Sequence, residues 1–143
     1  MLGRLQRDSV GTEGLVSMKE PPDLTGVRVL IADDELLCAM VLEEELTDMG
    51  GEIVGTVSSV GDIVETAKRG KADIAVLDVN LKGQLSYEAA LELMSYGVAV
   101  VFMTGYDHLV NCPEALKAAP LLIKPWTSEM LGETLSGVLA QKR

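Results

Sequence analysis

The stretch that decides the fold reads VRVLIADD and runs from Val27 to Asp34. Its first six residues are almost all apolar, and most have branched side chains. Such a run is typical of a strand that is covered on both faces of a sheet. Four further runs of the same character lie at residues 53–57, 74–77, 98–103 and 121–123. We therefore predict five buried strands.

Segments with the period of a helix separate these runs. Helices are predicted at residues 35–49, 60–69, 87–96 and 128–139. Ser86 and Ser128 are candidate N-caps. Strands and helices that alternate in this way form a parallel sheet with helices on both faces. The predicted fold is therefore an α/β, doubly wound (βα)5 three-layer sandwich with a parallel five-stranded sheet.

The fourth helix of this pattern is predicted to be short. Pro113 and Pro120 bracket the six residues that would form it. A proline interrupts a helix, so the segment has room for at most about two turns. Helices of that length are marginal without strong packing. We expect this helix to be short, frayed or mobile.

Composition and charge exclude several classes of function. The chain has 143 residues, and 22 acidic residues outnumber 12 basic ones to give a net charge of −10. Binding to nucleic acid or to an anionic membrane needs clustered Lys and Arg. No apolar stretch approaches the ~20 residues of a membrane helix. Cys38 and Cys112 lie far apart without metal-type spacing, which favours reduced thiols. We expect a cytoplasmic monomer that binds neither DNA nor membranes.

The first 26 residues differ from the rest of the chain. Six glycines and prolines interrupt them, and neither a helical nor a strand period persists. Terminal segments that bury little surface stay poorly ordered. We therefore predict a flexible N-terminal extension at residues 1–26 and a single domain at residues 27–143.

Polar residues stand where four of the five predicted strands end. They are Asp33 and Asp34 after the first strand, Asp78 after the third, Thr104 after the fourth and Lys124 after the fifth. Ligands of open α/β sheets bind at this edge. Three converging carboxylates repel one another unless a cation neutralises them, and Mg²⁺ prefers oxygen ligands. We therefore predict a Mg²⁺ site that includes all three aspartates.

The same residues can surround a phosphoryl group. Lys124 supplies a fixed positive charge and Thr104 a hydroxyl. Asp78 ends a central strand and is the expected nucleophile, which would attack phosphorus to form an acyl phosphate. The backbone carbonyl of Asn80 is expected as a further metal ligand. Pro125 follows the lysine, and because only X–Pro bonds adopt the cis form cheaply, a cis-proline that directs Lys124 is expected.

With these residues in this order, the chain resembles a two-component receiver domain, the phospho-accepting module of bacterial response regulators. The resemblance covers about residues 27–141 and rests on Asp33-Asp34, Asp78, Thr104 and Lys124-Pro125. It implies the strand order 2-1-3-4-5 and phosphorylation of Asp78 by a sensor histidine kinase or a histidine phosphotransfer protein. It also implies that Asp34 binds Mg²⁺ directly and Asp33 largely through water, that Thr104 moves to contact the phosphoryl group, and that Lys124 holds it.

A narrower resemblance concerns residues 101–106, which read VFMTGY, and residues 78–83, which read DVNLKG. They are similar to the single-domain regulators of alphaproteobacteria that carry the FATGUY motif, with Met103 in place of the usual alanine. That subgroup implies a role in general stress signalling and a kinase of the HWE or a related type.

The chain departs from ordinary receivers at one position. Receivers place an aromatic switch residue three positions before the lysine, where this chain has Leu121. Tyr106, two residues after Thr104, is the available aromatic side chain. We therefore expect Gly105, Tyr106 and Leu121 to be associated with switching, and we hypothesise that ordering of residues 105–120 carries the signal.

The expected function is a single-domain response regulator that signals by protein contact or by phosphotransfer. Such a domain is no enzyme, apart from catalysing its own phosphorylation and dephosphorylation. One alternative is an aspartate-nucleophile phosphatase of the haloacid dehalogenase type, which needs an acid where this chain has Asn80. Another is a receiver-like scaffold that acts without phosphorylation. A flavodoxin is disfavoured because residues 33–35 are all acidic and would repel a flavin phosphate.

Overall fold

A computed structural model describes residues 20–106 and 109–142. Most of the predicted N-terminal extension, residues 1–19, lies outside the described residues, as do residues 107–108 and 143. Leu24 belongs to the predicted extension, yet it is fully buried. Its backbone N–H donates a 2.8 Å hydrogen bond to the carbonyl of Met49. We therefore propose that the packed domain starts at or before Leu24.

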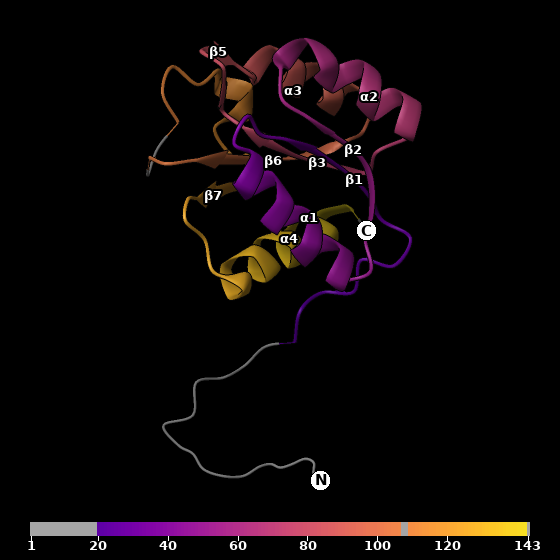
Figure 1. The fold of residues 1–143 in the computed structure, drawn as a ribbon. Coiled ribbons are helices and arrows are strands. Elements are labelled where there is room, and N and C mark those ends of the chain that lie inside the picture. The colour runs from indigo at the N-terminus through magenta and orange to yellow at the C-terminus, as the bar shows by residue number, and fades with distance from the viewer. Residues whose placement is uncertain (1–19, 107–108, 143) are drawn as a thin grey trace, which may run out of the picture.

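A five-stranded parallel sheet forms the middle layer of the molecule (Figure 1). In spatial order its strands are β2 (Glu52–Val57), β1 (Arg28–Ala32), β3 (Ile74–Asp78), β6 (Ala99–Thr104) and β7 (Leu121–Ile123). The predicted order 2-1-3-4-5 is confirmed. Every residue of the central β3 is buried, which explains why this strand reads as an uninterrupted apolar run.

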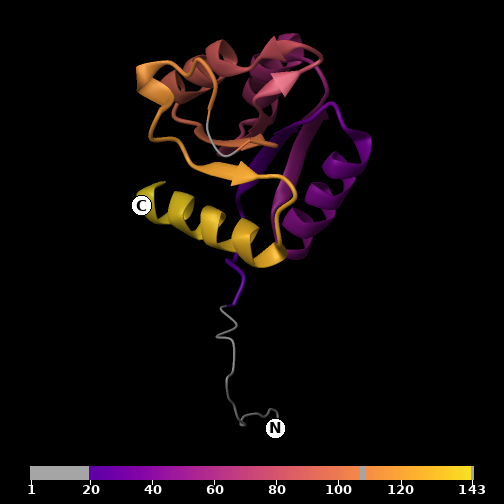
Figure 2. The ribbon, with the colours of Figure 1, turned by 90° about the vertical axis from the view of Figure 1, so that its left-hand side faces the viewer.

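Helices cover both faces of the sheet (Figures 1 and 2). One face carries α1 (Leu36–Asp48) and α4 (Ser128–Lys142), and the other carries α2 (Ile63–Gly70) and α3 (Tyr87–Ser95). Each face has its own apolar core, with Leu46 and Leu135 on the first face and Leu93 and Phe102 on the second. The predicted three-layer, doubly wound fold is confirmed. None of the helices in the described ranges is long and apolar enough to cross a membrane.

The fourth helix is reduced to a single turn. Between β6 and β7, the described residues contain only the 3-10 helix η3 (Glu114–Leu116). Pro113 precedes this turn and Pro120 follows it, so neither end can extend as a regular helix. Leu116 is fully buried and joins the core on the α2/α3 face. The prediction of a short fourth helix is confirmed, whereas its mobility stays a prediction.

A small hairpin that the sequence pattern did not predict follows β3. It consists of β4 (Asn80–Leu81) and β5 (Gln84–Leu85), which pair antiparallel across a two-residue turn. Lys82 and Gly83 form the turn with φ angles of 52° and 86°. Two positive φ angles are typical of the tight turns that join hairpin strands, and glycine adopts them at little cost. The hairpin places Lys82 beside the carboxyl edge of the sheet.

Of the two predicted N-caps, Ser86 occupies the N-cap position of α3 without a capping hydrogen bond, whereas the prediction for Ser128 is wrong. Ser86 precedes α3, but its hydroxyl donates to the backbone carbonyl of Asp78 at 2.8 Å instead of capping the helix. Ser128 is already the first residue of α4. The preceding residue, Thr127, accepts a 3.1 Å hydrogen bond from the Met130 N–H through its side chain. Thr127 is therefore the cap, since an N-cap oxygen satisfies an N–H of the first turn.

One prediction concerns the packing of α2 on β2. A Cβ atom added to Gly70 would lie 2.5 Å from the Cβ of Val54, which is fixed to its strand and cannot rotate away. We expect Gly70→Ala to lower the free energy of unfolding by about 1–3 kcal/mol, as overpacking does. Urea unfolding measures this. Gly61→Ala is the control, because nothing lies within 4 Å of its Cβ position. Equal unfolding midpoints for the two variants would contradict the prediction.

Candidate functional site

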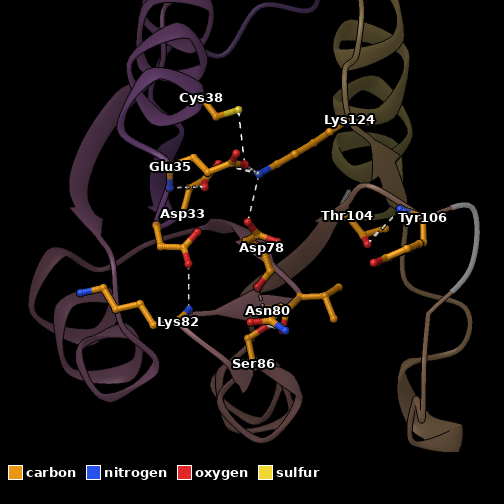
Figure 3. Close-up of polar contacts among 12 residues, drawn as sticks. Asp33, Glu35, Cys38, Asp78, Asn80, Lys82, Ser86, Thr104, Tyr106 and Lys124 are labelled. Atoms are coloured by element: carbon orange, nitrogen blue, oxygen red, sulfur yellow. Dashed lines mark hydrogen bonds and ion pairs between the residues drawn. The ribbon is translucent and has the colours of Figure 1, made fainter.

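The predicted polar residues lie at the carboxyl edge of the sheet (Figure 3). Asp33 and Asp34 directly follow β1, and Asp78 is the last residue of β3. Thr104 ends β6 and Lys124 directly follows β7. The parallel order β1-β3-β6-β7 explains why residues that are far apart in the sequence share one edge.

The ammonium group of Lys124 lies at the centre of this edge. Its Nζ atom is 3.1 Å from Oδ2 of Asp33, 2.7 Å from Oε1 of Glu35 and 3.0 Å from Oδ2 of Asp78. Figure 3 shows the lysine reaching across from the β7 side toward these carboxylates. Lys124 donates hydrogen bonds to Glu35 and Asp78, whereas its contact with Asp33 is an ion pair without a hydrogen bond. The peptide bond between Lys124 and Pro125 is cis, as expected.

Burial and ion pairing shift the pKa values of these groups. Burial raises the pKa of Asp78 above its ordinary value, although the Lys124 ammonium opposes this shift. Burial alone would lower the pKa of Lys124, but hydrogen bonds to Glu35 and Asp78 outweigh it and raise this pKa. The Lys124 hydrogen bond lowers the pKa of Glu35. The lysine therefore stays charged, while Asp78 gives up its proton less readily than an exposed aspartate.

The two aspartates after β1 have different surroundings. Asp33 is buried, and its Oδ1 atom accepts a 2.9 Å hydrogen bond from the N–H of Glu35. Its Oδ2 atom is also buried and accepts no hydrogen bond from a described residue, although the Lys124 ammonium lies nearby. Asp34 is exposed, and its Oδ2 atom accepts a 2.8 Å hydrogen bond from the N–H of Lys82 in the β4–β5 turn.

This set of carboxylates fits a hard divalent cation. Asp33, Asp34 and Asp78 each offer one oxygen, and these atoms all lie within 4.8 Å of one another. A buried carboxylate oxygen without a hydrogen bond has lone pairs that a cation can use, and Mg²⁺ takes oxygen ligands together with water. Asn80 donates its backbone N–H to the Asp78 carboxylate, and its side chain accepts from the N–H of Gly83. A metal contact from the Asn80 carbonyl stays a prediction.

Of the predicted switch-associated residues, Gly105 and Tyr106 follow Thr104 at the end of β6, whereas Leu121 lies at the start of β7. Thr104 is buried, and its hydroxyl accepts a 3.2 Å hydrogen bond from the N–H of Tyr106. Gly105 and Tyr106 are exposed. Leu121 is partly buried against the apolar core of the α2/α3 face, on a strand beside β6. Thr104 is thus at the correct edge, but its hydroxyl is bonded within its own loop.

Sequence reasoning missed two residues of the site. Glu35 contacts Lys124 more closely than either aspartate does, and its position directly after the acidic pair was a signal that could have found it. Ser86 is fully buried and binds the backbone carbonyl of Asp78 through its hydroxyl. That contact depends on the unpredicted hairpin, so the sequence carried no signal for it.

Comparisons with known proteins agree on one family. The profile of the response regulator receiver domain matches residues 29–136. The transcriptional regulatory protein PdtaR of Mycobacterium tuberculosis is 36% identical over 103 residues, which are 70% of this chain and 50% of PdtaR. The chain thus spans about half the length of that relative.

Solved structures of other proteins are also similar to this chain. The solution structure of SdrG from Sphingomonas melonis Fr1 has a TM-score of 0.70 and 33% identity, over 79% of this chain and 96% of SdrG. The anti-anti-sigma factor PhyR from Bartonella quintana has a TM-score of 0.67 and 25% identity, over 80% of this chain and 48% of PhyR.

The raised pKa of Asp78 predicts how stability depends on pH. The folded protein holds the Asp78 proton more tightly than the unfolded chain does. The contribution of Asp78 to the free energy of unfolding is therefore fully present below the ordinary aspartate pKa of 3.8, and it is lost as the pH rises through the higher pKa of the folded protein. We therefore expect Asp78→Asn to raise the free energy of unfolding at pH 7 without divalent cations, and the gain to shrink toward pH 4.

Urea unfolding in the presence of a chelator at both pH values measures the effect. Asp48→Asn, which removes an exposed carboxylate at the end of α1, is the matched control. A loss of stability in Asp78→Asn at pH 7 would mean that the attraction of Lys124 outweighs the cost of burial.

Proposed function

The chain belongs to the family of response regulator receiver domains, and we propose that it accepts a phosphoryl group on Asp78 from a histidine kinase in a Mg²⁺-dependent reaction. Receiver domains are signalling domains of two-component systems, and histidine kinases phosphorylate them. The observation that supports the proposal is the placement of the Lys124 ammonium 3.0 Å from Asp78, with Asp33 and Asp34 alongside.

Asp78 is suited to the role of nucleophile. Its carboxylate is buried at the end of the central strand, and the N–H of Asn80 and the ammonium of Lys124 orient it. One carboxylate oxygen attacks phosphorus, the bond between phosphorus and the histidine nitrogen breaks, and the bonding electron pair leaves with the imidazole. The product is an acyl phosphate on Asp78.

Charge neutralisation is the main requirement of this reaction. Asp33, Asp34 and Asp78 would hold Mg²⁺, whose positive charge would offset the negative charge on the phosphoryl oxygens. Lys124 binds a phosphoryl oxygen, for which it must leave at least one of its present carboxylate partners. Thr104 can donate its hydroxyl to another oxygen once it turns away from the N–H of Tyr106.

An exposed apolar surface on α1 lies beside the site and could bind a kinase partner. The first half of α1 exposes four large apolar side chains next to Glu35, namely Leu36, Leu37, Met40 and Val41. A groove of about 640 Å³ runs from there to Lys124 and Trp126. Exposed apolar patches of this kind mark contacts with other proteins. The helical domain that carries the kinase's phosphohistidine is the partner we assign to this surface.

The output is protein contact or phosphotransfer. SdrG aligns over almost its full length with this chain, and PhyR of Bartonella quintana is described as an anti-anti-sigma factor. We extend this to a role in stress signalling and to a kinase of the HWE type, in line with the FATGUY-like residues 101–106. A haloacid dehalogenase-type phosphatase is disfavoured, because Asn80 has a neutral amide where an acid is needed.

Phosphorylation is expected to require two of these side chains. Asp78→Asn removes the nucleophile and should abolish labelling by a phosphohistidine donor. Lys124→Ala removes the ammonium from the developing charge and should slow labelling by ~10²-fold or more. The measurement is the Mg²⁺-dependent incorporation of phosphate that is labile to acid, to base and to hydroxylamine. Asp48→Asn should label as the unaltered protein does, and undiminished labelling of Asp78→Asn would exclude Asp78 as the acceptor.

Metal binding is expected to be visible through Trp126. The indole Nε1 donates a 2.9 Å hydrogen bond to Glu45, and its ring lines the same groove as Glu35 and Lys124. Mg²⁺ should therefore alter its fluorescence when it draws carboxylates away from the lysine. Asp34→Asn should weaken Mg²⁺ binding at least roughly tenfold, since loss of a group that merely supports a metal ligand already costs that much.

Titration with Mg²⁺ at fixed ionic strength measures this affinity. Asp48→Asn again serves as the control for the loss of one negative charge. An unchanged affinity in Asp34→Asn would exclude Asp34 from the metal site.

A further inference from the structure

The segment from residue 109 to residue 119 links the Thr104 loop to β7 with little regular structure of its own. One-turn η3 is its only helix among the described residues. Several contacts hold the segment to the rest of the molecule, and Leu109, Cys112 and Ala119 pack against the core of the α2/α3 face. Leu116 is buried in the core of the α2/α3 face, and the backbone carbonyl of Val110 accepts a 2.6 Å hydrogen bond from the hydroxyl of Tyr87.

Tyr87 is itself held in one place. Its side chain is only 5% exposed, and its ring packs edge-to-face on Phe102, with the ring centroids 5.7 Å apart. Phe102 is a fully buried residue of β6, two residues before Thr104. Burial raises the pKa of the Tyr87 hydroxyl, which therefore stays a proton donor at neutral pH. Tyr87 thus contacts both the strand that carries Thr104 and the segment that follows it.

The residue before Tyr87 contacts the phosphoryl site. Ser86 is fully buried, and its hydroxyl donates to the backbone carbonyl of Asp78 at 2.8 Å. Two consecutive residues at the start of α3 therefore bind the backbone of Asp78 and the backbone of Val110. Because a single planar peptide unit joins these two residues, we expect a displacement at one contact to be passed to the other.

We propose that Tyr87 is the positioning residue that couples the phosphoryl site to residues 109–119, in the role that position 121 cannot fill because it holds a leucine. The proposal rests on the proposed function and concerns its regulation. In the unphosphorylated protein the Tyr87 hydroxyl holds Val110 against α3. Phosphorylation of Asp78 releases that contact and frees the segment for a partner.

The release follows from the geometry around Thr104. In the structure, the Thr104 hydroxyl accepts a hydrogen bond from the N–H of Tyr106. When it turns toward a phosphoryl oxygen, this hydrogen bond breaks, Tyr106 is released and residues 109–119 shift. The 2.6 Å hydrogen bond to Val110 cannot lengthen by more than a few tenths of an ångström and remain a strong contact. A buried hydroxyl without a partner is costly, so the segment has two distinct positions and no continuum between them.

The test compares Tyr87→Phe with Tyr96→Phe by amide hydrogen exchange. Tyr96 lies at the other end of α3, is exposed, and has a hydroxyl that accepts only a long 3.5 Å hydrogen bond from Lys68 among the described contacts. The reporters are the amides of Leu116 and Ala119, which donate to Pro113 and Leu116 within the segment. The mimic is beryllofluoride with Mg²⁺.

We expect the mimic to speed exchange at both reporters roughly fivefold in the unaltered protein, the equivalent of one net hydrogen bond. Tyr87→Phe should show this faster exchange without the mimic and should respond little to its addition. Tyr96→Phe should behave as the unaltered protein does. The effect of Tyr87→Phe must be confined to the segment, so the amides of β1 and β3 serve as an internal reference.

Two results would overturn the inference. One is that Tyr87→Phe protects both reporters as the unaltered protein does. The other is that this variant exchanges faster but still responds to the mimic by the same factor, which would make Tyr87 a purely structural contact. Failure of the proposed function is recognised separately, because the mimic would then leave the resonances of Asp78 and Lys124 unchanged. In that case there is no phosphoryl state to couple, and the inference fails together with the proposed function.

Discussion

The carboxyl edge of the sheet depends on one ammonium group. Lys124 Nζ lies within hydrogen-bond distance of carboxylates that come from the end of β1, the start of α1 and the end of β3. Burying a carboxylate is costly unless a counter-charge accompanies it, so these groups share their dependence on the lysine. A ligand that binds Asp33 or Asp78 here competes with Lys124 for these carboxylates. Binding is thereby linked to the relative positions of three separate elements.

The sequence was sufficient to predict the sheet and the residues at its edge. Buried parallel strands read as uninterrupted apolar runs, and the polar residue that follows each run then marks the edge. This logic located Asp78 on β3 and Lys124 after β7. It also predicted a short fourth helix, because Pro113 and Pro120 set a limit that no packing can relax.

The rest of the site depends on contacts that no local pattern reveals. The β4–β5 hairpin is formed by strands of two residues each, too short for a period to be visible, and it brings Lys82 to Asp34. Glu35 contacts Lys124 across 89 positions of sequence. Ser86 has the residue type and position of a helix cap, yet its hydroxyl binds the backbone carbonyl of Asp78 at the end of β3 and not an N–H of α3. In each case a tertiary neighbour outweighs the local preference.

The three partners of Lys124 differ in how readily they can be given up. The Glu35 side chain is 62% exposed, so water solvates it as soon as the lysine departs. The Asp33 side chain is fully buried, and without a bound cation the loss of the lysine would leave it with an uncompensated charge. Exposed ion pairs contribute at most about 1 kcal/mol, whereas removing one partner of a buried pair costs about 3–5 kcal/mol. An incoming phosphoryl oxygen should therefore displace Glu35 first. In the proposed reaction, Glu35 would thus be the partner that Lys124 gives up at little cost, while Asp33 would keep the ammonium beside Asp78.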